Sequence, residues 1–164
     1  MGITLVKDLK LQPQDKTLAC WYFSAKMMYA WAQANKKTGV KDPSTVTDPP
    51  ANLQQLYEWN SGYSRKTCKQ LASRLGLKAL ERKKRSFEDF KALIDKGPIW
   101  AAGAKSGVGD GVHVVVIGGV ADTGLYLYDP LPLCRGQKVW RTWDWLEGFF
   151  ALDDDGFDAN LLVV

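Results

Sequence analysis

The sequence has only one histidine, His113, and only three cysteines, Cys20, Cys68 and Cys134, in 164 residues. The cysteines stand far apart, which excludes a dense disulfide framework and a C-x-x-C pair for metal or redox chemistry. At least one thiol is therefore expected to stay free. Any chemistry that needs an imidazole must use His113.

Long hydrophobic runs are also absent. No apolar run approaches the roughly 20 residues that cross a bilayer, and the N-terminus lacks the charged-then-apolar pattern of a signal peptide, so no membrane partner is expected. The 22 Lys+Arg against 18 Asp+Glu give a net charge of +4, and this balance does not indicate a nucleic-acid partner. The length suits one compact core, and we expect residues 1–164 to form a single domain.

Apolar residues recur at three- and four-residue steps in the first 96 residues, as helices require. The predicted helices are a long buried one over residues 18–35, a shorter one over 52–60, one that Ser64 caps and Gly76 ends, and one that Ser86 caps before Gly97-Pro98. Residues 1–96 are therefore expected to be mainly helical.

After Gly97 short apolar runs alternate with Gly or Asp turns, which predicts strands. The predicted strands cover residues 99–102, 112–120, 125–128 and 138–141, with a short helix over 143–150 and a last edge strand over 161–164. We therefore expect an α+β fold, with a mainly β half over residues 97–164.

Cys20 opens the longest predicted helix. The unpaired backbone N–H groups and the positive end of the helix dipole favour an anion there, so the position suits a nucleophilic thiolate. A buried structural cysteine is the alternative interpretation.

His113 begins an apolar strand directly after residues 103–111, a predicted loop with four glycines. The ring can therefore lie at the end of the sheet beside a cleft, where a general base belongs. Asp129 follows 16 residues later at the end of the next strand, and Pro130 forces an extended exit. Adjacent strands would bring the two side chains together, although a hydrogen-bonded histidine and a simple Asp-Pro turn remain alternatives.

Gln14 precedes Cys20 by six residues, on the loop that leads into the helix. Its side-chain amide could face the same pocket as the backbone N–H of Cys20, and two such donors form an oxyanion hole. Gln12 competes for this role, and either glutamine could be a solvated loop residue.

A thiol at a helix start, an imidazole on a strand, a carboxylate to orient it and an amide donor are the parts of acyl transfer through a thioester. Their order resembles the papain-like cysteine peptidases. The matching motifs are Gln14 with Cys20-Trp21, Met27-Met28, Gly97-Pro98-Ile99-Trp100, the His113-Val-Val-Val-Ile-Gly-Gly run and Tyr128-Asp129-Pro130. The pattern is most similar to compact bacterial groups, namely peptidase domains of bacteriocin exporters that cut after a double glycine and cysteine-protease effectors delivered into other cells.

The resemblance implies a papain-like fold in which the N-terminal helical part, with the catalytic cysteine at the start of its long helix, packs on a C-terminal antiparallel sheet. It implies Cys20 as nucleophile, His113 as general base and acid, Asp129 as the group that orients His113, and Gln14 as oxyanion donor. It implies no metal and no cofactor.

The expected function is that of a thiol-dependent endopeptidase acting on a protein substrate, as a bacterial toxin or effector domain. Such a domain would be secreted or injected by a delivery system and act in the cytoplasm of a target cell, with a cognate immunity or inhibitor protein as a candidate partner. Alternatives are a Cys-His amidase, deamidase or peptidoglycan hydrolase, and an inert peptide-binding domain on the same fold. Retention of Cys20 and His113 argues against the inert alternative.

Overall fold

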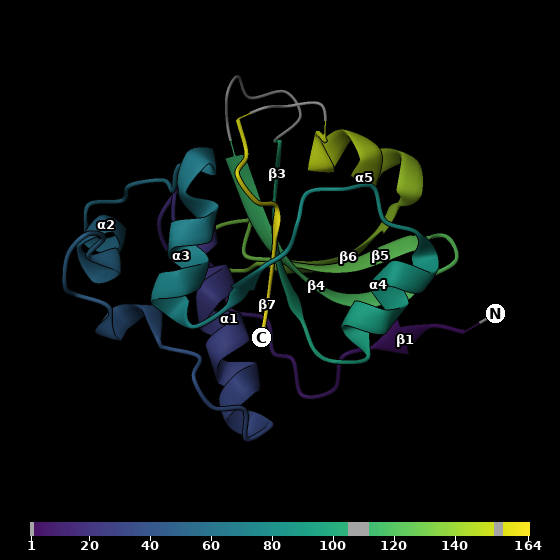
Figure 1. The fold of residues 1–164 in the computed structure, drawn as a ribbon, viewed down its shortest axis with the longest axis horizontal. Helices are drawn as coiled ribbons and strands as arrows, with labels where there is room; N and C mark the ends of the chain where they lie inside the picture. The colour runs from purple at the N-terminus through teal and green to yellow at the C-terminus, as the bar shows by residue number, and fades with distance from the viewer. Residues whose placement is uncertain (1, 105–111, 153–155) are drawn as a thin grey trace.

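The computed structural model describes residues 2–104, 112–152 and 156–164, which form an antiparallel sheet with helices on both faces (Figure 1). Within these residues the sheet has seven strands in the order β2-β7-β3-β4-β5-β6, and β1 pairs with β4 beside this path. The strands are β1 (Thr4–Leu5), β2 (Lys78–Ala79), β3 (Ile99–Ala104), β4 (Val112–Ala121), β5 (Gly124–Asp129), β6 (Gln137–Thr142) and β7 (Leu161–Val163). The helices are α1 (Cys20–Ala34), α2 (Leu53–Glu58), α3 (Cys68–Leu75), α4 (Phe87–Ile94) and α5 (Trp143–Phe150), with 3-10 turns η1 (Pro43–Thr45) and η2 (Arg65–Thr67). The predicted α+β class is confirmed, while the single-domain assignment of residues 1–164 stays a prediction.

Strand β4 is the centre of the sheet. Nine of its ten residues are buried, and it pairs with β3, β5 and β1. A strand covered on both faces has no need of polar residues, which explains its continuous apolar run instead of an alternating pattern. His113 is the second residue of this strand.

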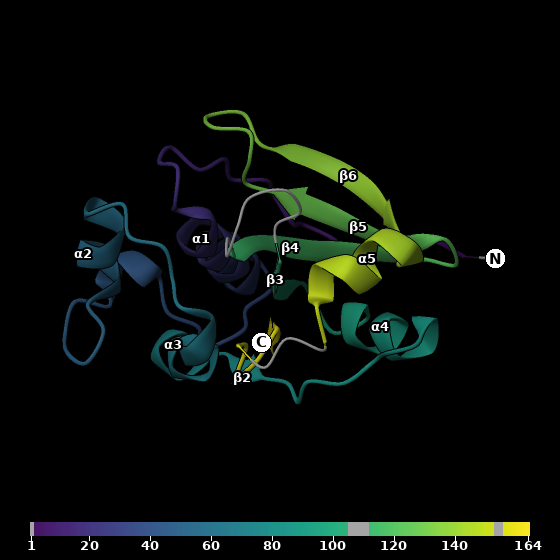
Figure 2. The same cartoon turned by 90° about the horizontal axis from the view of Figure 1, so that it is seen from above.

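The two faces of β3 are covered by different helices. The indole Nε1 of Trp100 donates to the backbone oxygen of Trp21 in α1, whereas Gly103 lies against Phe149 of α5. Successive strand side chains point to opposite faces, so residues 100 and 103 face opposite layers. Helices α1 to α3 accordingly lie on one side of the sheet and α4 and α5 on the other (Figures 1 and 2).

Helix α1 forms where the apolar periodicity predicts it. Its buried stripe includes Trp21, Met27 and Met28, which are 1%, 0% and 0% exposed. The prediction that Ser86 caps a helix is also confirmed, because its side chain accepts from the N–H of Asp89 and the Asp89 carboxylate accepts from the N–H of Ser86. Gly76, in the left-handed conformation at φ 70°, ends α3 as predicted.

Three local predictions were wrong. Ser64 caps the 3-10 turn η2, and Thr67 precedes α3 instead. Strand β7 is not at an edge, because the two-residue strand β2 pairs along its outer side. Residues 103 and 104, predicted as loop, extend β3 because they pair with His113 and Val112; the rest of that predicted glycine-rich loop, residues 105–111, lies outside the described residues.

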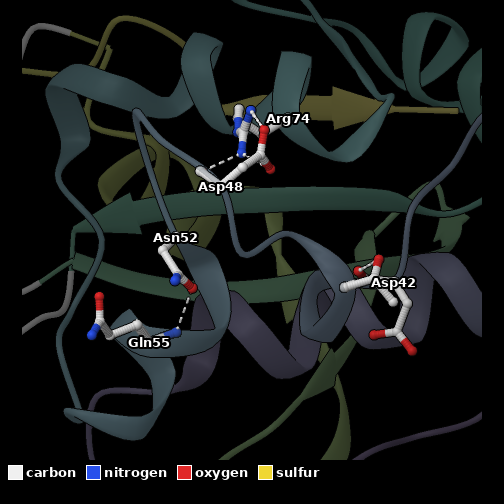
Figure 3. Close-up of polar contacts among 6 residues, drawn as sticks. Asp42, Asp48, Asn52, Gln55 and Arg74 are labelled. Atoms are coloured by element: carbon white, nitrogen blue, oxygen red, sulfur yellow. Dashed lines mark hydrogen bonds and ion pairs between the residues drawn. The ribbon is translucent and has the colours of Figure 1, made fainter.

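The segment that leads into α2 is fixed by side-chain hydrogen bonds. Arg74 of α3 forms an ion pair with Asp48 at 2.7 Å, and Asn52 caps α2 by accepting from the N–H of Gln55 at 2.9 Å (Figure 3). A side-chain N-cap satisfies one of the unpaired N–H groups at a helix start. Helix α2 therefore begins at a defined place relative to α3.

Candidate active site

Cys20 is the first residue of α1, at the position predicted for it. The residue before it, Ala19, makes no side-chain cap, and the first turn holds no acidic residue. The unpaired N–H groups of the first turn are therefore available to an anion, as at other helix starts. The sulfur-bearing residue itself is only 8% exposed.

His113 and Asp129 are brought together by the pairing of β4 with β5. Asp129 is the last residue of β5, and its Oδ1 lies 2.7 Å from Nε2 of His113. The same Oδ1 accepts from the backbone N–H of Leu131 at 2.9 Å. Both side chains are nearly buried, at 11% and 13% exposure, so little water competes for this contact.

Cys20 also influences the His113 ring, because it is one of the groups that raise the pKa of His113. Burial favours the neutral ring, but the hydrogen bonds to Asp129 and Cys20 outweigh it and raise the pKa of His113 from 6.5 to about 9. The ring is therefore protonated at neutral pH. A protonated imidazole can donate its proton to a leaving group, as a general acid does.

Because Nε2 of His113 is engaged by Asp129, Nδ1 is the ring nitrogen left for the sulfur of Cys20. A carboxylate that accepts from one nitrogen fixes the orientation of the ring and leaves the other nitrogen for proton transfer. The contact between His113 and Asp129 therefore leaves Nδ1 free to exchange a proton with a nucleophile.

Gln14 is completely buried on the loop before α1. Its Nε2 donates to the backbone oxygens of Lys16 at 2.8 Å and Thr17 at 3.1 Å, while its Oε1 is buried without a hydrogen-bond partner. Both amide hydrogens are thus used within the loop, so its role as an oxyanion donor stays a prediction. The competitor Gln12 instead donates to the backbone oxygen of Lys26 at 3.3 Å.

The backbone of Gln14 joins the loop before the thiol to the loop after Asp129. Its N–H donates to the oxygen of Pro130 at 3.0 Å, and its oxygen accepts from the N–H of Cys134 at 2.8 Å. Two loops more than 115 residues apart in sequence therefore meet at Gln14. The site is assembled from α1, β4, β5 and these two loops.

The other two cysteines lie in different surroundings. Cys68 is buried in α3, and burial followed by the charge of Asp158 raises the pKa of its thiol to about 12, so it stays protonated at neutral pH. Cys134 is exposed. Among the described residues no three His, Cys, Asp or Glu side chains gather as a metal site, and no described helix is long and apolar enough to span a membrane.

A cavity of about 390 Å³ lies elsewhere, between α4, α5 and residues 81–86. None of the four predicted site residues lines it. Its walls are mainly apolar, from side chains such as Phe90, Trp143 and Phe150. The cavity is therefore separate from the candidate active site.

A family model described as the papain-like cysteine protease AvrRpt2 matches residues 3–143. The chain belongs to this papain-like cysteine protease family. No curated protein sequence matches the protease. A crystal structure of a Bacillus anthracis protein assigned as a C39-like peptidase is similar in fold, with a TM-score of 0.59 at 15% identity over 100% of this chain and 98% of that one. The predicted papain-like fold and cysteine endopeptidase class are confirmed.

The segment 57–61, which the sequence did not mark as functional, contacts the loop in front of the protease's thiol. Asn60 bonds to Thr17 and Leu18, and the backbone oxygen of Ser61 accepts from the indole of Trp21. The Asn-Ser-Gly sequence at 60–62 is a turn signal, but nothing in it indicates a contact more than 40 residues away.

Proposed function

We propose that this protease hydrolyses peptide bonds of a protein substrate through a thioester on Cys20, with His113 as general acid and base and Asp129 as the residue that orients His113. The observation that carries the proposal is the 2.7 Å contact between His113 Nε2 and Asp129 Oδ1, and the contribution of Cys20 to the raised pKa of His113 supports it. A cysteine, an imidazole and a carboxylate linked in this order form an activated nucleophile.

In the acylation step the sulfur of Cys20 attacks the peptide carbonyl carbon, and the carbonyl oxygen becomes an oxyanion. The proton on His113 passes to the leaving amine as the C–N bond breaks, which leaves a thioester on Cys20. His113 is then neutral, takes a proton from water, and the resulting hydroxide attacks the thioester. The acid leaves, and Cys20 and His113 return to their starting state.

The oxyanion would be held by the backbone N–H of Cys20 and by Gln14. Because Gln14 Nε2 donates to Lys16 and Thr17 in the free protein, one of these bonds must be exchanged for a bond to the oxyanion when substrate binds. Catalytic hydrogen bonds of this kind form fully only in the transition-state complex.

The biological setting is part of the proposal. We infer that the protease is a bacterial effector or toxin, secreted or injected by a delivery system, which cleaves a protein in the cytoplasm of a target cell. Its similarity in motif pattern to delivered cysteine-protease effectors supports this setting, and a cognate immunity or inhibitor protein is the partner expected to block its site.

The test is a comparison of new protein N-termini in cells that express the wild-type chain or Cys20→Ala. Fragments that appear with wild type and disappear with Cys20→Ala are expected, whereas Cys134→Ser, which changes an exposed thiol, should cut as wild type does. Substrates that gain about one dalton with an intact chain would indicate deamidation instead, since hydrolysis of a side-chain amide exchanges an amino group for a hydroxyl. The absence of both signals would refute the assignment.

A further inference from the structure

We propose that Asn60 is a positioning residue for the oxyanion hole. On this proposal, which rests on the proposed function, its side chain holds the loop of residues 14–19 in place. The N–H of Cys20 can then reach the oxyanion, and so can the amide of Gln14 once it exchanges one of its loop bonds. Asn60 itself touches neither substrate nor the reacting atoms.

The side chain of Asn60 bonds to two consecutive residues of the loop before the nucleophile, Thr17 and Leu18. Its Oδ1 accepts from the backbone N–H of Leu18 at 2.9 Å, and its Nδ2 donates to Oγ1 of Thr17 at 2.9 Å. The first of these bonds ends only two residues before Cys20. A single side chain therefore fixes both a backbone group and a side chain of the loop.

The backbone of Asn60 is suited to this task. Its φ is 51°, a left-handed conformation that asparagine tolerates better than most side chains. Two backbone bonds maintain the turn after α2, from the N–H of Asn60 to Tyr57 at 2.9 Å and from the N–H of Ser61 to Leu56 at 2.9 Å. Because Asn52, Asp48 and Arg74 in turn fix the start of α2 (Figure 3), the side chain projects from a firmly held element.

Neighbours of Asn60 contact the same region. The hydroxyl of Tyr57 donates to the carboxylate of Asp15 at 2.8 Å, and Ser61 accepts from Trp21 Nε1 at 2.9 Å. Trp21 directly follows the nucleophile and is 1% exposed. Residues 57–61 therefore bond to the chain both before and after Cys20.

Gln14 holds the same loop from the inside. Its Nε2 donates to the oxygen of Thr17, whose hydroxyl accepts from Asn60. Thr17 thus lies between the predicted oxyanion donor and the proposed positioning residue. If the bond from Asn60 is lost, the loop can shift relative to α1 and misplace both oxyanion donors.

Such a shift should lower kcat and leave KM almost unchanged, because the oxyanion exists in the transition state and not in the bound substrate. Misplacement of donors by about 1 Å costs on the order of 10²-fold in rate. Direct alkylation of the thiol by iodoacetamide forms no oxyanion, so it should not depend on the loop.

The decisive variant is Asn60→Gly, because glycine keeps the left-handed backbone and removes both side-chain bonds. Asn60→Asp keeps the acceptor for Leu18 and loses the donor to Thr17, so it should recover part of the loss. Lys36→Gly is the matched control, since exposed Lys36 also has a left-handed φ of 55°. It follows the far end of α1, a helix of 15 residues that is about 22 Å long.

The substrate is a synthetic peptide that spans a cleavage site found by the N-terminal mapping. The transition-state probe is a peptide aldehyde with the residues that precede this cleavage site. Its aldehyde carbon adds to the thiol and forms a hemithioacetal. For Asn60→Gly we expect kcat to fall about 10- to 100-fold, KM to change by less than about two-fold, and aldehyde affinity to weaken in parallel with kcat. The rate of Cys20 alkylation should stay within about two-fold of wild type.

Unchanged kcat in Asn60→Gly would overturn the proposal while leaving the proposed function intact, provided that wild type cleaves and Cys20→Ala does not. A parallel loss of alkylation rate or of thermal stability would also overturn it, because the defect would then lie in the thiol or the fold. Wild-type protein without Cys20-dependent cleavage would instead refute the proposed function, and this inference with it.

Discussion

Two opposing effects set the pKa of His113. Burial favours the neutral ring, and the hydrogen bonds to Asp129 and Cys20 favour the protonated one, so that its pKa is about 9. The protonated form can give its proton to the leaving amine. Activity should therefore persist through neutral pH and fall as pH rises through the pKa of His113.

Asp129→Asn should move this alkaline limit. Loss of the carboxylate removes a partner that raises the pKa of His113, so the pKa falls toward 6.5 and the alkaline fall of kcat/KM shifts to lower pH. The measurement is kcat/KM between about pH 6 and 10, since this ratio reports groups of the free enzyme. Asp122→Asn, which changes an exposed carboxylate in the β4–β5 turn, should leave the profile in place. An unaltered limit in Asp129→Asn would mean that Asp129 does not set the charge of the ring.

The sequence allowed the positions of Cys20, His113 and Asp129 to be predicted because each lies at an end of a helix or strand that has a clear apolar pattern. The state of Gln14 and the contacts of Asn60 were not predictable in the same way. Both depend on which backbone groups lie within hydrogen-bond distance after folding, and the Asn60 partners are 42 and 43 residues away.

At the scale of elements, the turn after α3 depends on one glycine. Gly76 adopts φ 70° and its N–H bonds to the last turn of α3, while the N–H of Lys41 donates to the oxygen of Leu75 at 2.8 Å. A Cβ on Gly76 would collide with the backbone oxygen of Gly39. The segments around Gly39 and Gly76 can therefore approach this closely only because position 76 has no side chain.

Gly76→Ala should destabilise the protease by about 2 kcal/mol or more, because a left-handed alanine costs about 1–2 kcal/mol and the collision adds to it. The free energy of unfolding from urea denaturation measures this. Gly62→Ala is the matched control, since a Cβ there meets nothing within 4 Å, and it should change stability little. Equal stabilities for the two variants would contradict the contact with Gly39.

The longer elements were predictable and the shortest ones were not. Helix α5 and strands β3 to β6 have periodic or apolar patterns that extend over six residues or more. Strands β1 and β2 have two residues each, and only pairing with distant partners makes them strands. The wrong prediction that β7 is an edge strand follows from this, because its outer partner β2 was not predicted.

At the scale of the molecule, Asn160 joins parts of the fold that are distant in sequence. This residue is 4% exposed, and its Nδ2 donates to the oxygens of Ala102 in β3 and Phe150 in α5 at 3.0 and 3.2 Å. Its Oδ1 accepts from Nε of Arg82 at 2.6 Å. The side-chain amide of Asn160 therefore forms hydrogen bonds to the sheet, to α5 and to the segment before α4.

Asn160→Ala should lower the free energy of unfolding by about 3 kcal/mol, because it leaves buried carbonyl groups without their donor and removes an acceptor from Arg82. Thermal and urea unfolding measure the loss. Asn35→Ala, which removes a single bond to Trp31 at the end of α1, should cost about 1 kcal/mol or less. Similar losses in the two variants would argue against a joining role for Asn160.

The position of β7 between β2 and β3 has a consequence for biosynthesis. Residues 161–163 pair with Ile99, Trp100 and Ala101 of β3. On a nascent chain this side of β3 therefore stays unpaired until residues 161–163 leave the ribosomal exit tunnel. The thiol and the imidazole are synthesised well before that moment. Pairing on both sides of β3 is therefore one of the last steps in building this sheet as the chain emerges.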